Sequence, residues 1–476
     1  MLNKDFHSVL EKKVFQTVSR CANNLSLDSY LVGGFVRDHL LGKGKAKDID
    51  ILAVGSGIEL AKAVQKDLPG NQVVQIFKSY GTAMVKWGDL IIEFVGARKE
   101  SYSENSRNPK VYKGTLKDDQ NRRDFTINTI AVSLNAKDKG TLVDPFNGLK
   151  DLQNGIIRTP LEPNITYSDD PLRMFRAIRF ATQLNFKIEE QSLKAIRENA
   201  HRIAIVPNER IIEELHKIML SPKPSHGFLM LEQNRLLERI LPELIQLKGI
   251  DEIEGQSHKD NFYHTLEVVD NISQQTQDLW LRWAALLHDI GKAPTKKFHT
   301  KNGWTFHGHE FVGSKMVYKI FKRLKMPLNE NLKYVQKLVM MSSRPIIIAE
   351  DIVTDAAVRR LVFDAGNILE DLIILCEADI TTKNHSRFER YHNNFKLVRQ
   401  KIKEVEEKDR VRNFQPPVTG EMIMNHFNLR PCKEIGIIKE AIKEAILEGE
   451  IPNELEAAFA LMTEKGAEIG LEAHGE

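Results

Sequence analysis

The stretch that decides the fold of this chain is YLVGGFVRDHLLGKGKAKDIDILA, residues 30–53. Its first apolar residues run into Gly33 and Gly34, and an apolar run that ends at glycines is typical of a buried strand followed by a turn. Glycine lets the backbone approach a ligand closely, and the N–H groups that open the next helix can face an anion. A second strand is predicted at residues 48–53, so the order is strand, turn, helix, basic loop, strand.

Two carboxylates, Asp48 and Asp50, flank Ile49 in the second predicted strand. Because successive side chains of a strand point to opposite faces, both carboxylates share one face while Ile49 and Ile51 point into the core. Carboxylates held this close repel each other unless a cation lies between them, and hard oxygen ligands suit Mg²⁺. With Arg37 in the first turn of the preceding helix, where it could reach a phosphate, the stretch indicates phosphoryl or nucleotidyl transfer.

The fixed order of these features is more informative than any one of them. A lone Asp-x-Asp is usually a solvated strand end or a turn, and a lone Gly-Gly is equally nonspecific. In combination, LVGGFVRDHLLG (31–42) and DIDI (48–51) resemble the class II tRNA nucleotidyltransferases and the bacterial poly(A) polymerases. The resemblance implies that Asp48 and Asp50 are catalytic and hold Mg²⁺ in the head of the enzyme.

The composition sets outer limits on the protein. A chain of 476 residues is too long for one core, and 42% hydrophobic with 28% charged residues is ordinary for a soluble protein. A net charge of +3 does not by itself indicate a nucleic-acid-binding protein, although local basic patches could hold RNA. Three cysteines without paired spacing indicate a reducing compartment, and the charged N-terminus argues against a signal peptide. Since no apolar run approaches a membrane span, we expect a cytoplasmic protein with no membrane partner.

The rest of the first 150 residues favours a small mixed sheet. Helices are predicted at residues 1–25 and 58–68, and strands in QVVQIF, TAMVKW and LIIEFVGA. Glu93 in the last strand matches an acidic position of the resembled family, and it is either a third metal-facing carboxylate or a solvent-facing residue. The polar residues 97–119 predict a long loop, where the family has a flexible loop that helps to switch nucleotide choice.

The run NRRDFTINTIAVSL (121–134) is apolar at helical spacing from Phe125, which predicts a helix. In the resembled family it is a core motif near the ribose and the triphosphate. The resemblance therefore implies that Arg123 positions phosphates and that Asp124 contacts the ribose. From the residues alone, Asp124 is as readily a helix cap.

The run YSDDPLRMFRAIRFATQLNF (167–186) predicts a helix with Arg173, Arg176 and Arg179 at three-residue spacing. Such arginines are usually solvated or salt-bridged. A second interpretation is that Asp170 offers acceptors and Arg173 a donor fork, so that together they hydrogen-bond the edge of a base. The resembled family uses this helix as a protein template that selects CTP and ATP, which implies that Arg176 and Arg179 face the triphosphate.

From about residue 255 the chain changes character. His264, then the pair His288-Asp289, then Asp379 lie on successive predicted helices, and this order resembles the ligands of an HD phosphohydrolase domain. Imidazole and carboxylate ligands suit a divalent transition metal or Mg²⁺. The domain is either a metal-binding, hydrolytic domain or a relic scaffold.

The resemblances together imply an α+β fold, in which a small mixed-sheet nucleotidyltransferase palm is followed by an all-helical neck, HD domain and tail. The expected domains are the head at 1–150, a helical neck or template domain at 151–250, the HD domain at 255–400 and a helical tRNA-binding tail at 410–476. The expected nucleotide-binding residues are Gly33, Gly34, Arg37, Arg123, Asp124, Asp170, Arg173, Arg176 and Arg179.

The implied function is the template-independent addition of CCA to the 3′ end of tRNA from CTP and ATP, with release of pyrophosphate. The HD domain could add a metal-dependent phosphohydrolase activity, with a divalent metal of unknown identity. Three alternatives remain open: a bacterial poly(A) polymerase, an enzyme restricted to CC or to A addition, and a protein that acts chiefly as an HD phosphohydrolase. The sequence leaves the oligomeric state undetermined.

Overall fold

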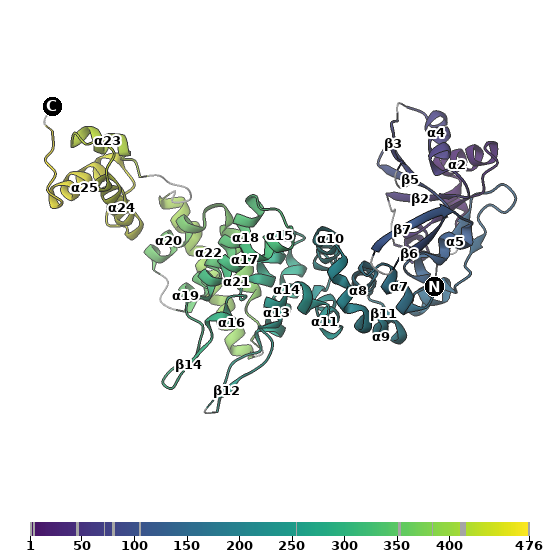
Figure 1. Ribbon diagram of the computed structural model, residues 1–476. Helices are drawn as coiled ribbons and strands as arrows, with labels where there is room; N and C mark the ends of the chain where they lie inside the picture. Colours follow the sequence, from purple (N-terminus) through teal and green to yellow (C-terminus); the bar gives the residue numbers. More distant parts are fainter. Residues whose placement is uncertain are drawn as a thin grey trace. The chain divides into compact units, whose positions relative to one another are not determined.

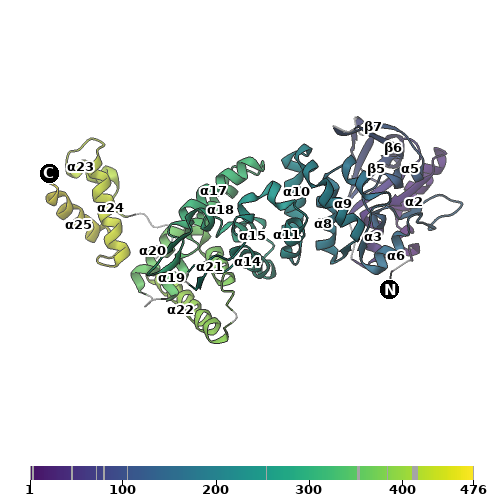
Figure 2. The same ribbon diagram turned by 60° about the horizontal axis from the view of Figure 1, so that its bottom comes forward.

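The protein is described by a computed structural model that covers residues 2, 5–43, 47–70, 72–78, 81–103, 106–253, 255–350, 354–382, 384–409 and 416–474. The chain divides into two compact units, residues 1–242 and 243–476 (Figures 1 and 2). Each unit is described by itself.

The first unit is built on a seven-stranded sheet in the order β3-β4-β5-β2-β1-β8-β9. Its strands are β1 (Ser29–Val32), β2 (Asp48–Ala53), β3 (Val74–Phe77), β4 (Thr82–Trp87), β5 (Leu90–Gly96), β8 (Ala131–Ser133) and β9 (Leu142–Val143). The β2–β5 pair is parallel and the other pairs are antiparallel, so the sheet is mixed, as predicted.

The two faces of this sheet differ in burial. Helix α4 (Gly57–Asp67) packs on β4 and β5, and α2 (Lys13–Asn24) packs on α4. Ile49 and Ile51 are at most 1% exposed, whereas Asp48 on the other face is exposed. The side chains of β2 alternate between the two faces of the sheet, so its carboxylates point away from the core. Helix α3 (Gly34–Leu40) follows β1 directly, as the glycine turn predicted.

The N-terminal helix predicted at residues 1–25 is two helices, α1 (His7–Leu10) and α2. The long loop predicted for 97–119 is wrong as well. Strands β6 (Arg98–Ser103) and β7 (Ser106–Lys113) form an antiparallel hairpin, and α5 (Leu116–Asn121) follows it. A two-stranded hairpin tolerates Pro109 because both of its strands are edges, so the proline did not exclude a strand.

The helix predicted from Phe125 is a third error. A short 3₁₀ turn, Thr126–Asn128, leads into strand β8. The apolar residues of this run, Phe125, Ile127, Ile130, Ala131 and Leu134, are all fully buried. A segment buried on every side has no polar face, so its apolar spacing cannot separate strand from helix.

The unit continues as a helical layer with one short parallel pair, β10 (Ile156–Ile157) and β11 (Lys187–Ile188). Its helices are α6 (Gly148–Asn154), α7 (Pro163–Asp169), α8 (Leu172–Leu184), α9 (Glu190–Asn199), the 3₁₀ helix Ala200–Ile205, α10 (Asn208–Met219), α11 (Pro224–Gln233) and α12 (Leu237–Ile240). Helix α8 packs between α10 and α11 on one side and the β10–β11 pair on the other, which fixes its arginine-bearing face.

The second unit is mainly helical, with two short hairpins, β12 (Glu252–Ile253) with β13 (Gln256–Ser257) and β14 (Lys297–His299) with β15 (Gly303–Thr305). Its helices are α13 (Pro242–Ile245), α14 (Asn261–Gln275), α15 (Leu279–Leu287), α16 (Lys292–Thr295), α17 (His309–Arg323), α18 (Glu330–Met341), α19 (Arg344–Glu350), α20 (Asp355–Ala365), α21 (Leu369–Ala378), α22 (His385–Asp409), α23 (Gly420–His426), α24 (Lys433–Glu448) and α25 (Leu455–Glu468).

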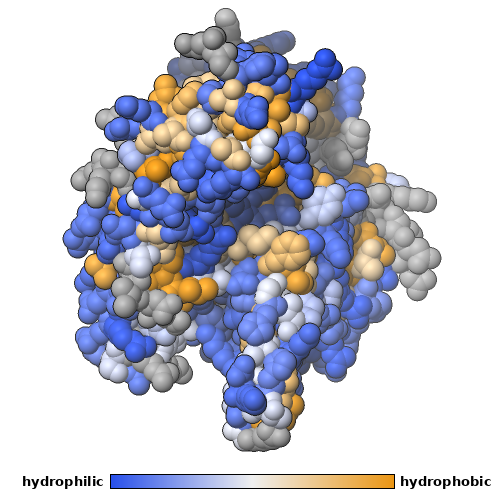
Figure 3. Space-filling view, turned by 90° about the vertical axis from the view of Figure 1, so that its left-hand side faces the viewer, coloured by the Kyte–Doolittle hydropathy of each residue, from blue (hydrophilic) through white to orange (hydrophobic). Residues whose placement is uncertain are grey.

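Helices α14, α15, α18 and α21 pack on one another and enclose the fully buried Trp283. On the face drawn in Figure 3, apolar side chains are scattered among hydrophilic ones. Within the described residues, no helix is both long enough and apolar enough to span a bilayer.

Candidate active site and metal centre

Three carboxylates share one face of the sheet at β2 and β5. Asp48 and Asp50 project from β2, and Glu93 is the register partner of Asp50 on β5. Burial raises the pKa of Asp50 to about 6; Arg123 opposes this shift, and Glu93 and Asp48 add to it. Ionised carboxylates this close together repel one another. A divalent cation that prefers oxygen ligands, such as Mg²⁺, would relieve this repulsion.

The glycine turn lies directly against these carboxylates. Gly33 has a φ of +76°, a conformation that side-chain-bearing residues rarely adopt. A Cβ atom at Gly33 would lie 2.5 Å from Oδ2 of Asp50 and 3.6 Å from Nη1 of Arg123. Glycine is therefore required both by the backbone and by the approach of the turn to Asp50.

A hydrogen-bonded chain links α3 to α8 through Asn128. Arg37 donates from Nη1 to Oδ1 of Asn128 at 3.0 Å, and it also pairs with Asp38 at 2.8 Å. Asn128 donates from Nδ2 to Oδ1 of Asp124 at 3.0 Å, and Asp124 accepts from Nε of Arg176 at 2.8 Å. Despite burial, Arg176 lowers the pKa of Asp124, so the carboxylate stays ionised. Asp124 thus positions Arg176, which differs from the helix-cap interpretation.

Arg123 is held beside the same cluster by a buried carboxylate. Its Nε donates to Oδ2 of Asp119 at 3.0 Å, and its Nη1 donates to the carbonyl of Asn128 at 3.3 Å. Asp119 is fully buried, so it holds the guanidinium in place but cannot itself contact a ligand that binds from solvent. Arg37 and Arg123 therefore contact Asn128 directly, and Arg176 is joined to it through Asp124. Arg123 and Asp50 both lie against Gly33.

Asp170 and Arg173 lie at the junction of two helices. Helix α7 ends at Asp169 and α8 begins at Leu172, so Asp170 lies in the kink between two helices. Its Oδ1 accepts from the backbone N of Leu172 at 3.2 Å, and Arg173 donates from Nη2 to the carbonyl of Arg122 at 2.6 Å. Nη1 of Arg173 also donates to the carbonyl of Thr166 at 3.5 Å. A guanidinium has five N–H donors, so these two contacts leave donors for a base edge.

Phe180 gathers three guanidiniums around its ring. The Cζ atoms of Arg37, Arg176 and Arg179 lie 4.9, 5.6 and 3.8 Å from the ring centroid. Arg179 also pairs through Nε with Oε2 of Glu214 on α10 at 2.6 Å. Phe180 thereby connects the arginine of α3 with two arginines of α8.

The second unit brings the four predicted HD residues together. Nε2 of His264 lies 2.7 Å from Oδ1 of Asp379 and 3.7 Å from Oδ2 of Asp289. Nε2 of His288 lies 3.5 Å and 3.4 Å from the same two oxygens. One ligand atom each from His264, His288 and Asp379 lies within 4.8 Å of the others. Asp289 is also bound by Nζ of Lys292 at 2.6 Å.

The tautomer of His288 leaves its inner nitrogen available for a metal. Nδ1 lies 2.8 Å from the carbonyl of Ala285, so this nitrogen carries the proton of the neutral ring. Nε2 is buried, and no described residue makes a well-aligned hydrogen bond to it. Burial lowers the pKa of His288, but Asp289 and Asp379 outweigh burial and raise it to about 10, so the centre favours a positive charge at Nε2, which either a proton or a divalent cation can supply. The donor set and the negative potential fit a divalent cation.

A pocket of about 360 Å³ opens on this centre. His264 and Asp379 form part of its wall, and Lys259 and Lys292 lie at the same pocket. Lys259 donates from Nζ to Oγ1 of Thr381 at 3.3 Å. Two lysines beside a metal centre are suited to a phosphate-bearing ligand.

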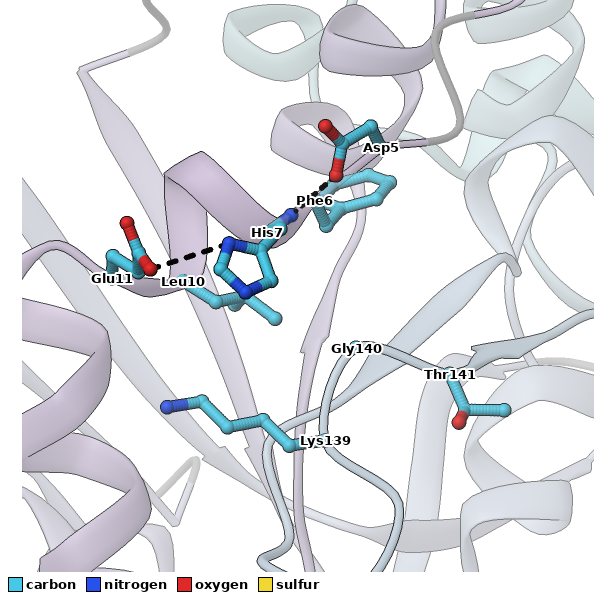
Figure 4. A pocket seen from close by; sticks show the side chains of 8 residues that line it. All are labelled: Asp5, Phe6, His7, Leu10, Glu11, Lys139, Gly140 and Thr141. Atoms are coloured by element: carbon cyan, nitrogen blue, oxygen red, sulfur yellow. Dashed lines mark hydrogen bonds and ion pairs between the residues drawn. The ribbon is translucent and has the colours of Figure 1, made fainter.

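A different pocket, of about 650 Å³, lies between α1 and the turn at Lys139–Thr141 (Figure 4). Figure 4 shows His7 paired with Glu11, at 3.3 Å, and Lys139 facing them across the opening. It contains none of the predicted site residues, and it lies at the β9 end of the sheet order, away from β2.

Four positioning residues escaped the sequence analysis, namely Asp119, Asn128, Phe180 and Glu214. Asn128 and Phe180 lie inside runs that the sequence singled out, but neither was given a role there. Both contact Arg37, which is distant in sequence: Asn128 and Arg37 are 91 residues apart. Pattern analysis carries no signal for such contacts.

Sequence models of three families match the chain. The model described as "Poly A polymerase head domain" matches residues 29–158, and the model "HD domain" matches 261–384. A third, "Probable RNA and SrmB- binding site of polymerase A", matches 185–247. The first match contains the three carboxylates, and the second contains all four HD residues.

Curated relatives are similar over 45% to 74% of the chain. An A-adding tRNA nucleotidyltransferase of Deinococcus radiodurans is 34% identical over 351 residues, covering 72% of this chain and 78% of that protein. One of Aquifex aeolicus is 40% identical over 217 residues, covering 45% of this chain and 26% of that protein. A multifunctional CCA protein of Alkalilimnicola ehrlichii is 31% identical over 365 residues, covering 74% of this chain and 83% of that protein.

Solved structures share the fold. The Thermotoga maritima CCA-adding enzyme complexed with tRNA has a TM-score of 0.60 at 22% identity and covers 97% of both chains. A CCA-adding enzyme in complex with ATP has a TM-score of 0.65 at 22% identity, covering 98% of this chain and 99% of that one. The head with its carboxylates, the HD centre and these relatives lead to one conclusion: the chain belongs to the tRNA nucleotidyltransferase family, with a poly(A) polymerase-type head domain and an HD domain.

Proposed function

We propose that this protein completes the 3′ end of tRNA by adding C, C and A from CTP and ATP. The observation that carries the proposal is the cluster around Asn128, which contacts Arg37 and Arg123 directly and Arg176 through Asp124, with Arg123 and Asp50 both against Gly33. The carboxylates offer a metal site, and the arginines offer a triphosphate site. Helix α8 supplies groups that can read a base. The relatives' names support tRNA as the acceptor.

In the proposed reaction the 3′-oxygen of tRNA attacks the α-phosphorus of the nucleotide, and the bond to the β-phosphate breaks. Pyrophosphate leaves, and the hydroxyl proton passes to solvent. Mg²⁺ held by Asp48 and Asp50 would supply the electrostatic stabilisation of the charge that develops on the phosphoryl oxygens. Gly33 lets the turn approach these carboxylates, and Arg37 and Arg123 pair with the phosphates.

Base selection is assigned to the start of α8. Asp170 supplies acceptors from the kink, and Arg173 supplies the N–H donors that its contacts with Arg122 and Thr166 leave over. Arg176 and Arg179 face the triphosphate from the next turns of the helix. A carboxylate accepts hydrogen bonds and a guanidinium donates them, so together they can bind the donors and acceptors on the Watson–Crick edges of cytosine and adenine.

Extension of tRNA transcripts that lack A, CA or CCA tests this proposal. Each transcript is incubated with ATP alone, CTP alone and both nucleotides. We expect CCA to be restored on all three transcripts, after which addition stops. Unlimited A tails from ATP alone would overturn the proposal in favour of a poly(A) polymerase, and addition of C residues only would identify a CC-adding enzyme.

A second candidate, addition of the terminal A alone, is favoured by a specific observation. The relatives from Deinococcus radiodurans and Aquifex aeolicus, at 34% and 40% identity, are both named A-adding tRNA nucleotidyltransferases. The same assay separates the two candidates. An A-adding enzyme extends only the transcript that ends in CC, and it ignores CTP.

For the HD centre we propose a separate, metal-dependent phosphohydrolase activity. Its support is the buried Nε2 of His288 beside two carboxylates, with Lys259 and Lys292 at the adjoining pocket. Divalent-metal binding is measured by calorimetry on the wild type and on His288→Ala, and hydrolysis is measured with bis(p-nitrophenyl) phosphate. We expect the variant to lose both. Metal binding without any hydrolysis would mark the domain as a scaffold.

A further inference from the structure

The exposed face of helix α17, in the second unit, combines two aromatic residues with three basic ones. Phe311 is 51% and Tyr318 is 43% exposed, and Lys315, Lys319 and Lys322 are exposed as well. With 3.6 residues per turn, positions 311, 315, 318 and 322 fall within a narrow arc of the helix, and position 319 lies beside them. These five residues form a single line, which we call the α17 stripe.

The other side of α17 is committed to the interior of the unit. Val317, Ile320 and Phe321 are fully buried, and the helix packs on α18. Single exposed apolar residues are common on protein surfaces. Exposed rings that alternate with lysines along one line are a different pattern, and packing within the unit does not account for it.

The α17 stripe carries positive charge that no acidic residue interrupts. Glu310 is the one carboxylate in the sequence of α17, and it lies on another side of the helix, where the hydroxyl of Ser343 donates to it. Nζ of Lys315 lies 3.9 Å from the centroid of the Phe311 ring. This cation–π contact holds an ammonium group and a π-surface together at one point of the stripe.

Two kinds of partner fit this surface poorly. A helix that lies on a membrane inserts its apolar face into the lipid, but the apolar face of α17 is already buried inside the protein. A second copy of the chain would meet this surface with the same surface in a two-fold dimer, so lysines would face lysines. A polyanion with flat, stackable groups is complementary to both parts of the stripe.

We infer that the α17 stripe binds RNA, with its lysines on backbone phosphates and with Phe311 and Tyr318 against bases. Phosphate contacts and base–aromatic stacking are the two interactions through which proteins hold RNA largely irrespective of its sequence. The inference rests on the proposed function, which makes tRNA the partner, and it adds a contact surface in the second unit.

The charge of the stripe is tested by the affinity of the full-length protein for labelled tRNA, measured without nucleotides at several salt concentrations. Lys315→Ala/Lys319→Ala is compared with Lys62→Ala/Lys66→Ala, which removes two exposed lysines at the same spacing from α4. We expect the stripe variant to bind about tenfold more weakly. Its slope of log Kd against log salt should fall by about 1.4–1.8, because each phosphate contact contributes about 0.7–0.9. The α4 variant should bind as the wild type does.

The rings of the stripe are tested with Phe311→Ser/Tyr318→Ser. Loss of stacking should weaken tRNA binding about tenfold, while the salt slope stays unchanged because no charge is removed. Both side chains are about half exposed, so the thermal unfolding temperature should remain near that of the wild type.

Wild-type affinity in both stripe variants, or an equal loss of affinity in the α4 variant, would overturn the inference. Wild-type tRNA binding in the stripe variants together with lost binding to vesicles of phosphatidylglycerol and phosphatidylcholine would identify a membrane surface instead. The binding measurement involves no turnover, so it is separable from the proposed function. A wild type that binds tRNA through the stripe but adds no nucleotide would refute the proposed function alone.

Discussion

At the scale of single residues, Gly33 carries the strictest requirement in the head. Replacing it with alanine would place a Cβ 2.5 Å from Oδ2 of Asp50, on a backbone with a φ of +76°. Either the turn or the carboxylate must move, and a shift of ~1 Å in a catalytic group can cost about 100-fold in rate. We therefore expect Gly33→Ala to lower nucleotide addition about 100-fold.

Gly81→Ala is the control for this prediction, because Gly81 has a similar φ of +64° but a Cβ there would meet nothing within 4 Å. Both variants place alanine at a positive φ, so Gly81→Ala should also lower the thermal unfolding temperature, while its rate should stay near wild type. Equal loss of activity in the two variants would contradict the role given to Gly33.

Asn128 is the residue through which Arg37 and Asp124 are joined. Asn128→Ala leaves both partners without this bridge, so we expect a higher KM for nucleotide and a loss of stability of about 1–3 kcal/mol. Asn135→Ala, which removes a hydrogen bond to the backbone N of Ser29 elsewhere in the sheet, should cost stability without changing the KM. Urea denaturation and steady-state kinetics measure the two effects, and an unchanged KM in Asn128→Ala would contradict the proposed bridge.

At the scale of elements, the coupling between α3 and α8 depends on Phe180. The ring faces three guanidiniums and packs edge-on against Phe125, with centroids 5.8 Å apart. Each cation–π contact contributes about 0.5–2 kcal/mol, and an aliphatic side chain supplies none. We expect Phe180→Leu to raise the KM for nucleotide, Phe180→Tyr to restore it, and the KM for tRNA to remain constant in both.

Phe175→Leu serves as the matched control for that substitution. Phe175 is on the same helix and fully buried, so its replacement perturbs packing alone. If Phe175→Leu raised the KM for nucleotide as much as Phe180→Leu, the ring of Phe180 would have only a packing role.

The sequence predicted those elements whose pattern differs between faces. Strand β2 was predicted because Asp48 and Asp50 alternate with isoleucines, and α8 because arginines recur on one side of it. The 3₁₀ turn and strand from Phe125 were missed because that segment is buried on all sides. The β6–β7 hairpin was missed because its polar composition resembles that of a loop.

The candidate site was predictable to a similar extent. Residues that carry chemistry in a fixed local order, such as Gly33 with Asp50, were visible in the sequence. Residues that hold them, such as Asn128 and Glu214, act through partners on other elements. Their identity depends on the tertiary fold, which no local pattern encodes.

At the scale of the whole molecule, the chain carries two chemically different centres, each within its own unit. Asp48 and Asp50 form an all-oxygen site in the first, and His264, His288 and Asp379 form a mixed nitrogen and oxygen site in the second. We assign nucleotide addition to the first centre alone. Loss of either centre should therefore leave the chemistry of the other intact.

The measurement that tests this assignment most directly is the single-turnover rate of AMP addition to tRNA ending in CC. It is compared for the wild type, Asp48→Ala and His288→Ala, with thermal unfolding as a check on folding. The account predicts that Asp48→Ala lowers the rate by several orders of magnitude and that His288→Ala leaves it near wild type. Near-wild-type addition by Asp48→Ala, or its abolition in a folded His288→Ala protein, would contradict the account.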